Sequence, residues 1–219
     1  MTRLLPLFPL DVVLLPETLL PLHVFESRYR ALLADALAGD RLIGLHTLDP
    51  RGAPLPDGRP ALLAFGCAGK VVEHEPLEDG RSNIVLRGVF RYRVSGERGG
   101  RPYRLAQVEE APVRPLPSGR EGGPARRDLR RLLARSVERL ADSVGRGEAR
   151  HLPAALSDEG LVNEAASRLG LGAEERYALL AMDGLEERYA WVLDHVRSLQ
   201  TRVDLLAPFR REGADPRWN

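Results

Sequence analysis

A proline- and glycine-rich stretch near the middle of the chain, PVRPLPSGREGGP from Pro112 to Pro124, separates two halves with different apolar periodicity. Before it, apolar residues alternate or form short proline-bounded runs, which is typical of strands. After it, they recur every three or four residues, which is typical of helices. The stretch itself is too polar and too rich in breakers to form a core. We therefore expect a β-rich part (1–117), a linker (118–124), a helical part (125–206) and a flexible tail (207–219).

The strongest strand signal is a hairpin. GCAGKVVEHEPL and SNIVLRGVFRYRV flank Glu78–Arg81, a glycine-containing connection of hairpin length. In the second segment Phe90, Tyr92 and Val94 alternate with arginines, so we expect one buried face and one exposed face. Further strands are expected in LLPLFPL, DVVLLP, RLIGLHTL and YRLAQVEEA.

One helix is expected inside the β-rich part, starting at Glu26 and stopping at Gly39, because Phe25, Tyr29 and the leucines that follow recur at helical spacing. Asp183, followed three residues later by Glu186, resembles a capping box at the start of the last helix. The helices expected in the second half are Ala125–Val144, Asp158–Leu169, Glu174–Met182 and Gly184 to about Leu206.

Composition limits the class of protein. The 32 basic and 31 acidic residues leave a net charge of +1, which argues against a protein built mainly to hold nucleic acid. Cys67 has no partner for an intramolecular disulfide, which favours a reducing compartment. Pro6 and Pro9 interrupt the first apolar run, and no window has the length of a membrane span. We expect a cytoplasmic protein without a signal peptide.

Motifs for catalysis are not found. Lys70 is the only lysine, but Ala64 and Val71 occupy the positions where a P-loop needs glycine and a hydroxyl. There is no Gly-x-Ser-x-Gly motif, Cys67 reads as a small buried residue, and the five histidines lack metal-ligand spacing. We predict no catalytic residue, no cofactor and no metal ligand.

A basic segment, residues 126–150, has two interpretations. Its eight arginines against four acids could hold an RNA backbone. Alternatively, they form the exposed face of a helix whose buried stripe is Leu129, Leu132, Leu133, Val137 and Leu140. We favour the second interpretation, because no aromatic residues are interleaved for base stacking.

The N-terminal stretch LPLFPLDVVLLPETLLPLHVFESRYRALL resembles the Lon N-terminal domain family, the substrate-binding module of ATP-dependent Lon proteases. FGCAGKVV, LRGVFRYRV and LGLGAEERYALLAMDGLEERYAWVL resemble later family segments, so the resemblance covers about residues 4 to 205. It departs at Glu17, where a glycine commonly follows the proline. The motif is carried by Pro21, Leu22, Val24, Phe25, Glu26, Arg28 and Tyr29.

The resemblance implies an α+β protein: a PUA-like pseudobarrel with an embedded helix, followed by a C-terminal helical bundle. It implies a non-enzymatic module without the ATPase and protease modules of Lon, binding unfolded or apolar polypeptide segments in a groove between the halves. Candidate contacts are Phe90, Tyr92, Tyr189 and Trp191, although each is more typical of a core. The alternatives are an RNA-binding protein using the barrel and the basic helix, or an adaptor docking onto a protease or chaperone.

Glu26 and Arg28 are interpreted as framework. A carboxylate near the first turn of a helix interacts favourably with its exposed amides. We expect Arg28 to reach a strand carbonyl or an acid across the sheet.

Overall fold

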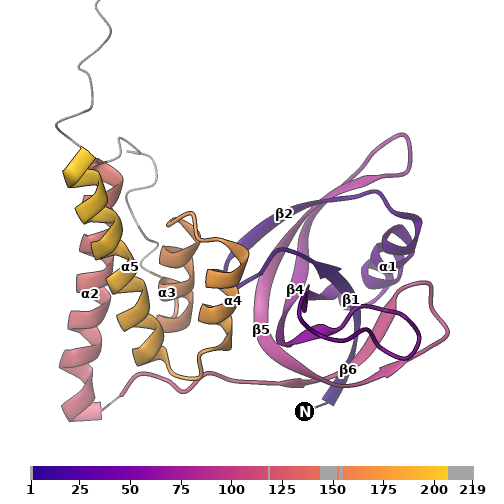
Figure 1. Ribbon diagram of the computed structural model, residues 1–219, viewed down its shortest axis with the longest axis horizontal. Coiled ribbons are helices and arrows are strands. Elements are labelled where there is room, and N and C mark those ends of the chain that lie inside the picture. The colour runs from indigo at the N-terminus through magenta and orange to yellow at the C-terminus, as the bar shows by residue number, and fades with distance from the viewer. Residues whose placement is uncertain (1, 118, 144–151, 153–154, 207–219) are drawn as a thin grey trace, which may run out of the picture.

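A computed structural model describes residues 2–117, 119–143, 152 and 155–206 as a mixed α+β structure with a six-stranded sheet and five helices. The strands are β1 (Thr2–Leu10), β2 (Leu19–Val24), β3 (Leu42–Leu48), β4 (Leu62–Pro76), β5 (Ser82–Arg98) and β6 (Arg104–Glu110). The helices are α1 (Ser27–Ala38), α2 (Gly119–Ser143), α3 (Asp158–Ser167), α4 (Ala173–Ala181) and α5 (Leu185–Leu206). The strands and α1 lie on one side of the molecule and α2 to α5 on the other (Figure 1).

The sheet closes on itself. Its strand order is β2-β5-β4-β3-β1-β6, and β5 also pairs with β6, so β5, β4, β3, β1 and β6 form a ring that we call the barrel. β1 runs parallel to β3, and every other pair is antiparallel. β2 lies outside the ring and pairs only with β5 among the described strands. The likeness of this barrel to a PUA fold stays a prediction.

The predicted hairpin is confirmed as β4 and β5, and the strands expected at β1, β3 and β6 are present. The strand expected in DVVLLP is wrong. Val13, Leu14 and Leu15 are all buried in succession, which an alternating strand with one core face does not allow. This loop passes so close to β5 that a Cβ on Gly88 would lie 2.1 Å from the Leu15 carbonyl oxygen.

The embedded helix is present as α1 and ends at the expected glycine, Gly39. Tyr29, Leu32 and Leu33 form its buried face against the barrel. Phe25 was expected on the same apolar stripe, but it is 60% exposed. It precedes the helix, and its ring stacks on His23 with the centroids 6.1 Å apart.

In the second half, α3, α4 and α5 begin and end within two residues of the predicted positions. The helix α2 begins at Gly119, so most of the segment 118–124 expected to be a linker is helical. Leu132, expected in the buried stripe of α2, is 45% exposed, whereas Leu133 and Val137 are buried. The end predicted for this helix at Val144, the rest of the basic segment to 150, and the tail 207–219 lie outside the described residues.

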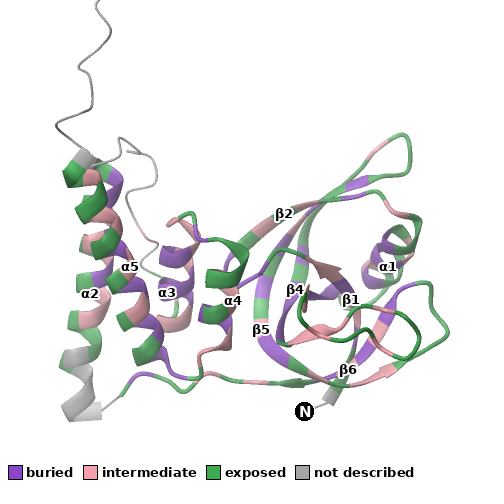
Figure 2. Cartoon of the chain, viewed as in Figure 1, coloured by how far each residue is buried: buried purple, intermediate pink, exposed green. Residues whose placement is uncertain are grey.

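The core is continuous across the two halves. One cluster of buried residues joins α1, the sheet and α2 to α5, and the buried residues follow the surfaces where these elements meet (Figure 2). A smaller cluster lies among the barrel strands around Tyr92, which is 0% exposed. Cβ atoms on Gly44 or Gly66 would lie 2.7 and 2.5 Å from the Tyr92 ring system, so both glycines make room for it.

His46 is buried beside Tyr92. Its Nε2 lies 2.7 Å from the Leu63 carbonyl oxygen, and because a carbonyl only accepts, Nε2 carries the proton. Nδ1 lies 3.2 Å from the Tyr92 hydroxyl. Burial lowers the pKa of His46 to about 4, so the imidazole is neutral at neutral pH.

Candidate functional site

Two arginines meet at the C-terminal end of α4, where the helical half contacts the barrel, and Arg91 is the one that joins the two halves. Both donate to the carbonyl oxygens at the C-terminal end of α4, which have no partner within the helix and carry its negative dipole. Arg91 comes from β5 and Arg188 from α5, and they are 4% and 0% exposed. Because α4 has no basic residue in its last turn, the two guanidinium groups replace a cap from the helix itself.

Arg91 contradicts the alternation expected for β5, which placed it on the exposed face. Its Nη1 donates to the carbonyls of Leu180 and Met182 at 3.0 and 3.1 Å. Its Nη2 bonds Asp183 Oδ1 at 2.7 Å, and this hydrogen bond lowers the pKa of the Asp183 carboxyl. The outer face of β5 is thus exposed near its start and covered by the helices at Arg91. Asp183, expected as a helix cap, contributes its carboxylate to this contact.

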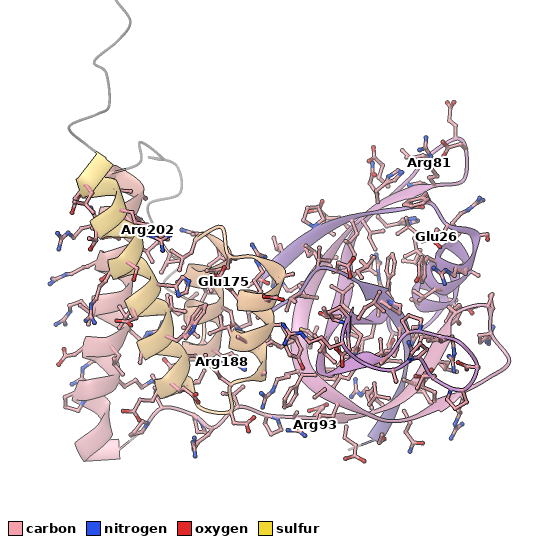
Figure 3. The ribbon with its side chains drawn as sticks, in the orientation of Figure 1. Glu26, Arg81, Arg93, Glu175, Arg188 and Arg202 are labelled. Carbon is pink, nitrogen blue, oxygen red and sulfur yellow. The ribbon has the colours of Figure 1, made fainter. Side chains whose placement is uncertain are left out.

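Arg188 completes the junction from the other side. Its Nη1 lies 3.0 Å from Glu159 Oε1, and Nη2 lies 3.0 Å from the carbonyl oxygens of both Leu180 and Met182. Burial lowers the pKa of the guanidinium and the Glu159 carboxylate opposes this. Figure 3 shows Arg188 within the helical half, well away from Glu26 at α1.

Glu17 forms another contact between the halves. It has a φ of 64°, the left-handed region that glycine adopts without strain, and this is the position where the family resemblance predicts glycine. Its carboxylate accepts a hydrogen bond from the hydroxyl of Ser157, whose Oγ in turn accepts from the Gly160 amide at 2.9 Å and caps α3. The departure from glycine therefore places a negative charge at the N-terminus of α3.

An apolar strip lies next to this junction, on the outer face of β2 and β5. Leu19 pairs with Arg87 and Pro21 with Val85 across the two strands, and Val89 follows on the same face of β5. Leu19 is 56% and Val89 46% exposed. We define the apolar strip as Leu19, Pro21, Val85 and Val89, and the exposed Arg87 lies between the two valines opposite Leu19.

The strip ends at a cavity of about 200 Å³ between the two halves, which we call the junction cavity. Val89 is common to the strip and the cavity. Ala111 and Val113, in the segment after β6, supply further apolar lining, and Arg91 and Glu159 supply charged groups. The arrangement is an exposed strand face that leads into a small cavity with both apolar and charged lining, and such a cavity can hold part of a ligand.

The four aromatic residues proposed from the sequence are not brought together here. Tyr92 and Tyr189 are 0% exposed, and the Tyr189 hydroxyl bonds the Asp158 carbonyl oxygen at 3.1 Å. Trp191 is half-buried and stacks on His195. Phe90 is also half-buried, but it lines the junction cavity. Sequence reasoning missed Leu19 and Val89, since an apolar residue on an exposed strand face looks like a core residue in a sequence pattern.

The residues of the N-terminal motif divide between framework and surface. Tyr29 is buried against Phe8, with ring centroids 4.2 Å apart, and Leu22 is half-buried on β2. Glu26 is the residue that precedes α1, and its side chain makes no capping hydrogen bond. Arg28 does not reach across the sheet as expected: its Nε bonds Glu26 Oε2 at 2.9 Å on the surface.

Some arginines of the basic helix α2 form ion pairs with other parts of the chain. Arg126 and Arg130 bind the two carboxylate oxygens of Asp158 at 2.6 and 2.7 Å, which attaches α2 to the start of α3. Arg130 also donates to the Leu156 carbonyl. These contacts support the interpretation of α2 as an amphipathic structural helix.

Among the described residues, no three His, Cys, Asp or Glu side chains are grouped so that they could hold a metal ion. Cys67 is 1% exposed in β4, and burial raises the pKa of its thiol, which keeps it unreactive. In the part of the chain that the structure covers, no helix combines the length and hydrophobicity needed to span a bilayer.

Residues 4–198 match the family model of the ATP-dependent protease La (LON) substrate-binding domain, and the chain belongs to this family. A Lon protease of Trichlorobacter lovleyi is 29% identical over 209 residues, covering 94% of this chain and 24% of the relative. The chain thus spans about a quarter of the length of the curated relatives it matches.

Two solved structures are similar in fold. The Lon N-terminal domain protein from Xanthomonas campestris aligns with a TM-score of 0.59 and 26% identity, over 88% of this chain and 98% of that one. The N-terminal domain of the Mycobacterium avium complex Lon protease aligns with a TM-score of 0.64 and 17% identity, over 89% and 98% of the two chains.

Proposed function

We propose that this chain is a non-catalytic module that binds exposed apolar segments of unfolded polypeptides on the apolar strip and in the junction cavity. The observation that carries the proposal is the strip itself. The solvated face of an antiparallel sheet usually carries polar residues, yet Leu19 and Val89 expose about half of their surface there. Membership of the substrate-binding family supports the same role.

The shape of the site favours an extended ligand. β2 pairs with β5 along one edge only, so its other edge offers backbone groups to a strand-like segment. Pro21 in the middle of β2 lacks an amide proton, which limits how continuous such pairing can be. We expect side chains of the ligand to contact the strip. Binding should be weak, with a Kd on the order of micromolar, because an unfolded ligand loses conformational entropy when it binds.

The test is the binding of a reduced, permanently unfolded model protein at about 0.5 M salt, where exposed ionic contacts are screened. We expect binding to the unfolded form and none to the native form, with a negative heat-capacity change. Val89→Asp should weaken binding at least about tenfold, since it places a charge in an apolar contact. Leu4→Asp, at a residue that is 42% exposed on β1, is the matched control and should bind normally.

RNA binding through the barrel and α2 remains the alternative, and salt separates the two functions. Affinity for RNA falls steeply between low and moderate salt, whereas apolar binding does not. Equal binding of native and unfolded protein, or loss of the complex at moderate salt, would contradict the proposed function. We also expect no ATPase or peptidase activity. Docking of the module onto a protease or chaperone is compatible with the same strip.

A further inference from the structure

A second hollow lies at the end of the barrel remote from the helical half. It has a volume of about 440 Å³ and is formed by the start of α1, the loop between β3 and β4, and the connection between β5 and β6. These segments are far apart in the sequence, and α1 lies on the side of the barrel opposite α2 to α5 (Figure 1). We call this hollow the arginine pocket, because Arg28, Arg59, Arg98, Arg101 and Arg104 line it.

Four of the five arginines are already paired with carboxylates of the chain. The nitrogen–oxygen distances are 2.8 Å for Arg28 with Glu26, 2.6 Å for Arg59 with Asp57 and 3.0 Å for Arg101 with Asp35, and Arg104 pairs with Glu97.

Arg98 differs from these four. It is exposed, and among the described residues no carboxylate contacts its guanidinium group. Five guanidinium charges less four carboxylate charges leave a local charge of +1. The pocket is therefore matched to one negative charge.

The remaining lining is apolar or aromatic. Pro9, Leu48 and Pro60 contribute apolar surface, and the ring of Tyr103 is 8% exposed at the wall. Burial, followed by its hydrogen bond to the Asp35 carboxylate, raises the pKa of Tyr103 to about 12, so the phenol stays neutral and adds no negative charge. A ligand that fits these walls carries its charge on a small organic body.

The connection between β5 and β6 leaves open space beside the arginines. Arg98 and Arg101 flank Gly99 and Gly100, and Gly100 has a φ of 93°. Nothing lies within 4 Å of a Cβ placed on either glycine, so described side chains do not fill the space next to Arg98.

We propose that the arginine pocket binds a single carboxylate of a polypeptide, with Arg98 as its charge partner. The choice of a polypeptide rests on the proposed function, but the site is separate from the apolar strip. One carboxylate neutralises the local charge and can take two parallel hydrogen bonds from a guanidinium group. A phosphate dianion would leave an excess negative charge next to four carboxylates. The carboxylate can come from an Asp or Glu side chain or from the C-terminus of the polypeptide.

The experiment uses three short peptides with the same apolar sequence and an uncharged fluorescent label. The first contains one Glu and has an amidated C-terminus, the second has no acidic residue and a free C-terminus, and the third is neutral and amidated. Fluorescence anisotropy at low salt should show at least about tenfold tighter binding of the first or the second than of the third. Which of the two binds identifies the source of the carboxylate.

Variants locate the site. Arg98→Gln should abolish the preference over the neutral peptide, while Arg135→Gln, at an exposed arginine of α2 outside both the pocket and the apolar strip, should keep it. Equal binding of all three peptides, or an unchanged preference in Arg98→Gln, would overturn the proposal. Displacement of the bound peptide by inorganic phosphate at lower concentration than by acetate would also overturn it.

The two proposals fail in different ways. If the unfolded protein does not bind at about 0.5 M salt, or if Val89→Asp has no effect on that binding, the proposed function fails. The preference for a carboxylate and its loss in Arg98→Gln would then still support the arginine pocket.

Discussion

The two arginine clusters of this molecule, at the junction and in the arginine pocket, differ in their exposure and in their hydrogen-bond partners. At the junction, the side chains of Arg91 and Arg188 are 3% and 0% exposed, and backbone carbonyls of α4 take most of their hydrogen bonds. In the arginine pocket, the side chains of Arg28 and Arg101 are both 53% exposed and pair with exposed carboxylates. A buried guanidinium group with fixed partners is framework, whereas an exposed one can exchange its partner. Arginine content alone therefore identifies no function.

The largest expected effect is on the junction. Arg188→Ala removes the partner of Glu159 and one of the two arginine donors to the α4 carbonyls, so the free energy of unfolding should fall by about 3–4 kcal/mol. Chemical denaturation measures it. Arg197→Ala is the control, because that side chain is 67% exposed and should cost less than about 0.5 kcal/mol. Equal effects of the two variants would contradict the assignment of the buried Arg188 as a framework residue.

The pH dependence of stability tests the burial of His46 inside the barrel. Burial lowers the pKa of His46 to about 4 in the folded state, below its value of 6.5 when unfolded. The unfolded chain therefore binds the extra proton first, and stability present above pH 6.5 is lost as the pH falls toward 4, by about 2–3 kcal/mol. His46→Gln should lack this part of the pH dependence. The prediction is wrong if the free energies of unfolding of the unaltered protein and of His46→Gln change in parallel between pH 7 and 4.

Glu17 tests a junction contact that carries backbone strain. Glu17→Ala keeps the positive φ and loses the contact with Ser157, so it should cost about 1–2 kcal/mol. Glu17→Gly loses the same contact but relieves the strain, and should be more stable than Glu17→Ala by about 1 kcal/mol. Thermal unfolding of the pair measures the difference, and the reverse order would contradict the assigned backbone role.

The smallest effect is expected at the edge of the arginine pocket. Capping by Glu26 would make Glu26→Ala cost about 0.5–2 kcal/mol, but its side chain makes no capping hydrogen bond. Its pairing with Arg28 on the surface predicts a loss of less than about 0.5 kcal/mol. If denaturant titration showed that the free energy of unfolding falls by more than about 1 kcal/mol, Glu26 would be a framework residue, as Arg188 is.

Local patterns predicted most of the elements. The β4–β5 hairpin and α1 depend on turn residues and apolar spacing within a short stretch, and both are found. The burial of Arg91 was not predictable in this way, because its partners Leu180 and Met182 lie about 90 residues further along the chain. Among the junction residues, the sequence singled out Glu17, through its departure from glycine, and Asp183, although as a helix cap.

The candidate site was less predictable than the fold. Tyr92 and Tyr189 were proposed as contacts because aromatic residues are common in interfaces, but the structure buries both. Leu19 and Val89 became visible only when the pairing of β2 with β5 placed them on an outer face. Whether one face of a strand is buried depends on which elements cover that face, and the pattern of the strand's own residues does not predict them.

Hydrogen exchange of the protein with and without a permanently unfolded polypeptide tests most directly whether recognition occurs at the apolar strip. We expect amides of β2 and of β5 near Val85–Val89 to become protected, together with those of 111–113 at the junction cavity. Amides of α2 should exchange as in the free protein. Protection confined to α2, or no change at β2 and β5 while the polypeptide is bound, would contradict the assignment of the strip as the binding surface.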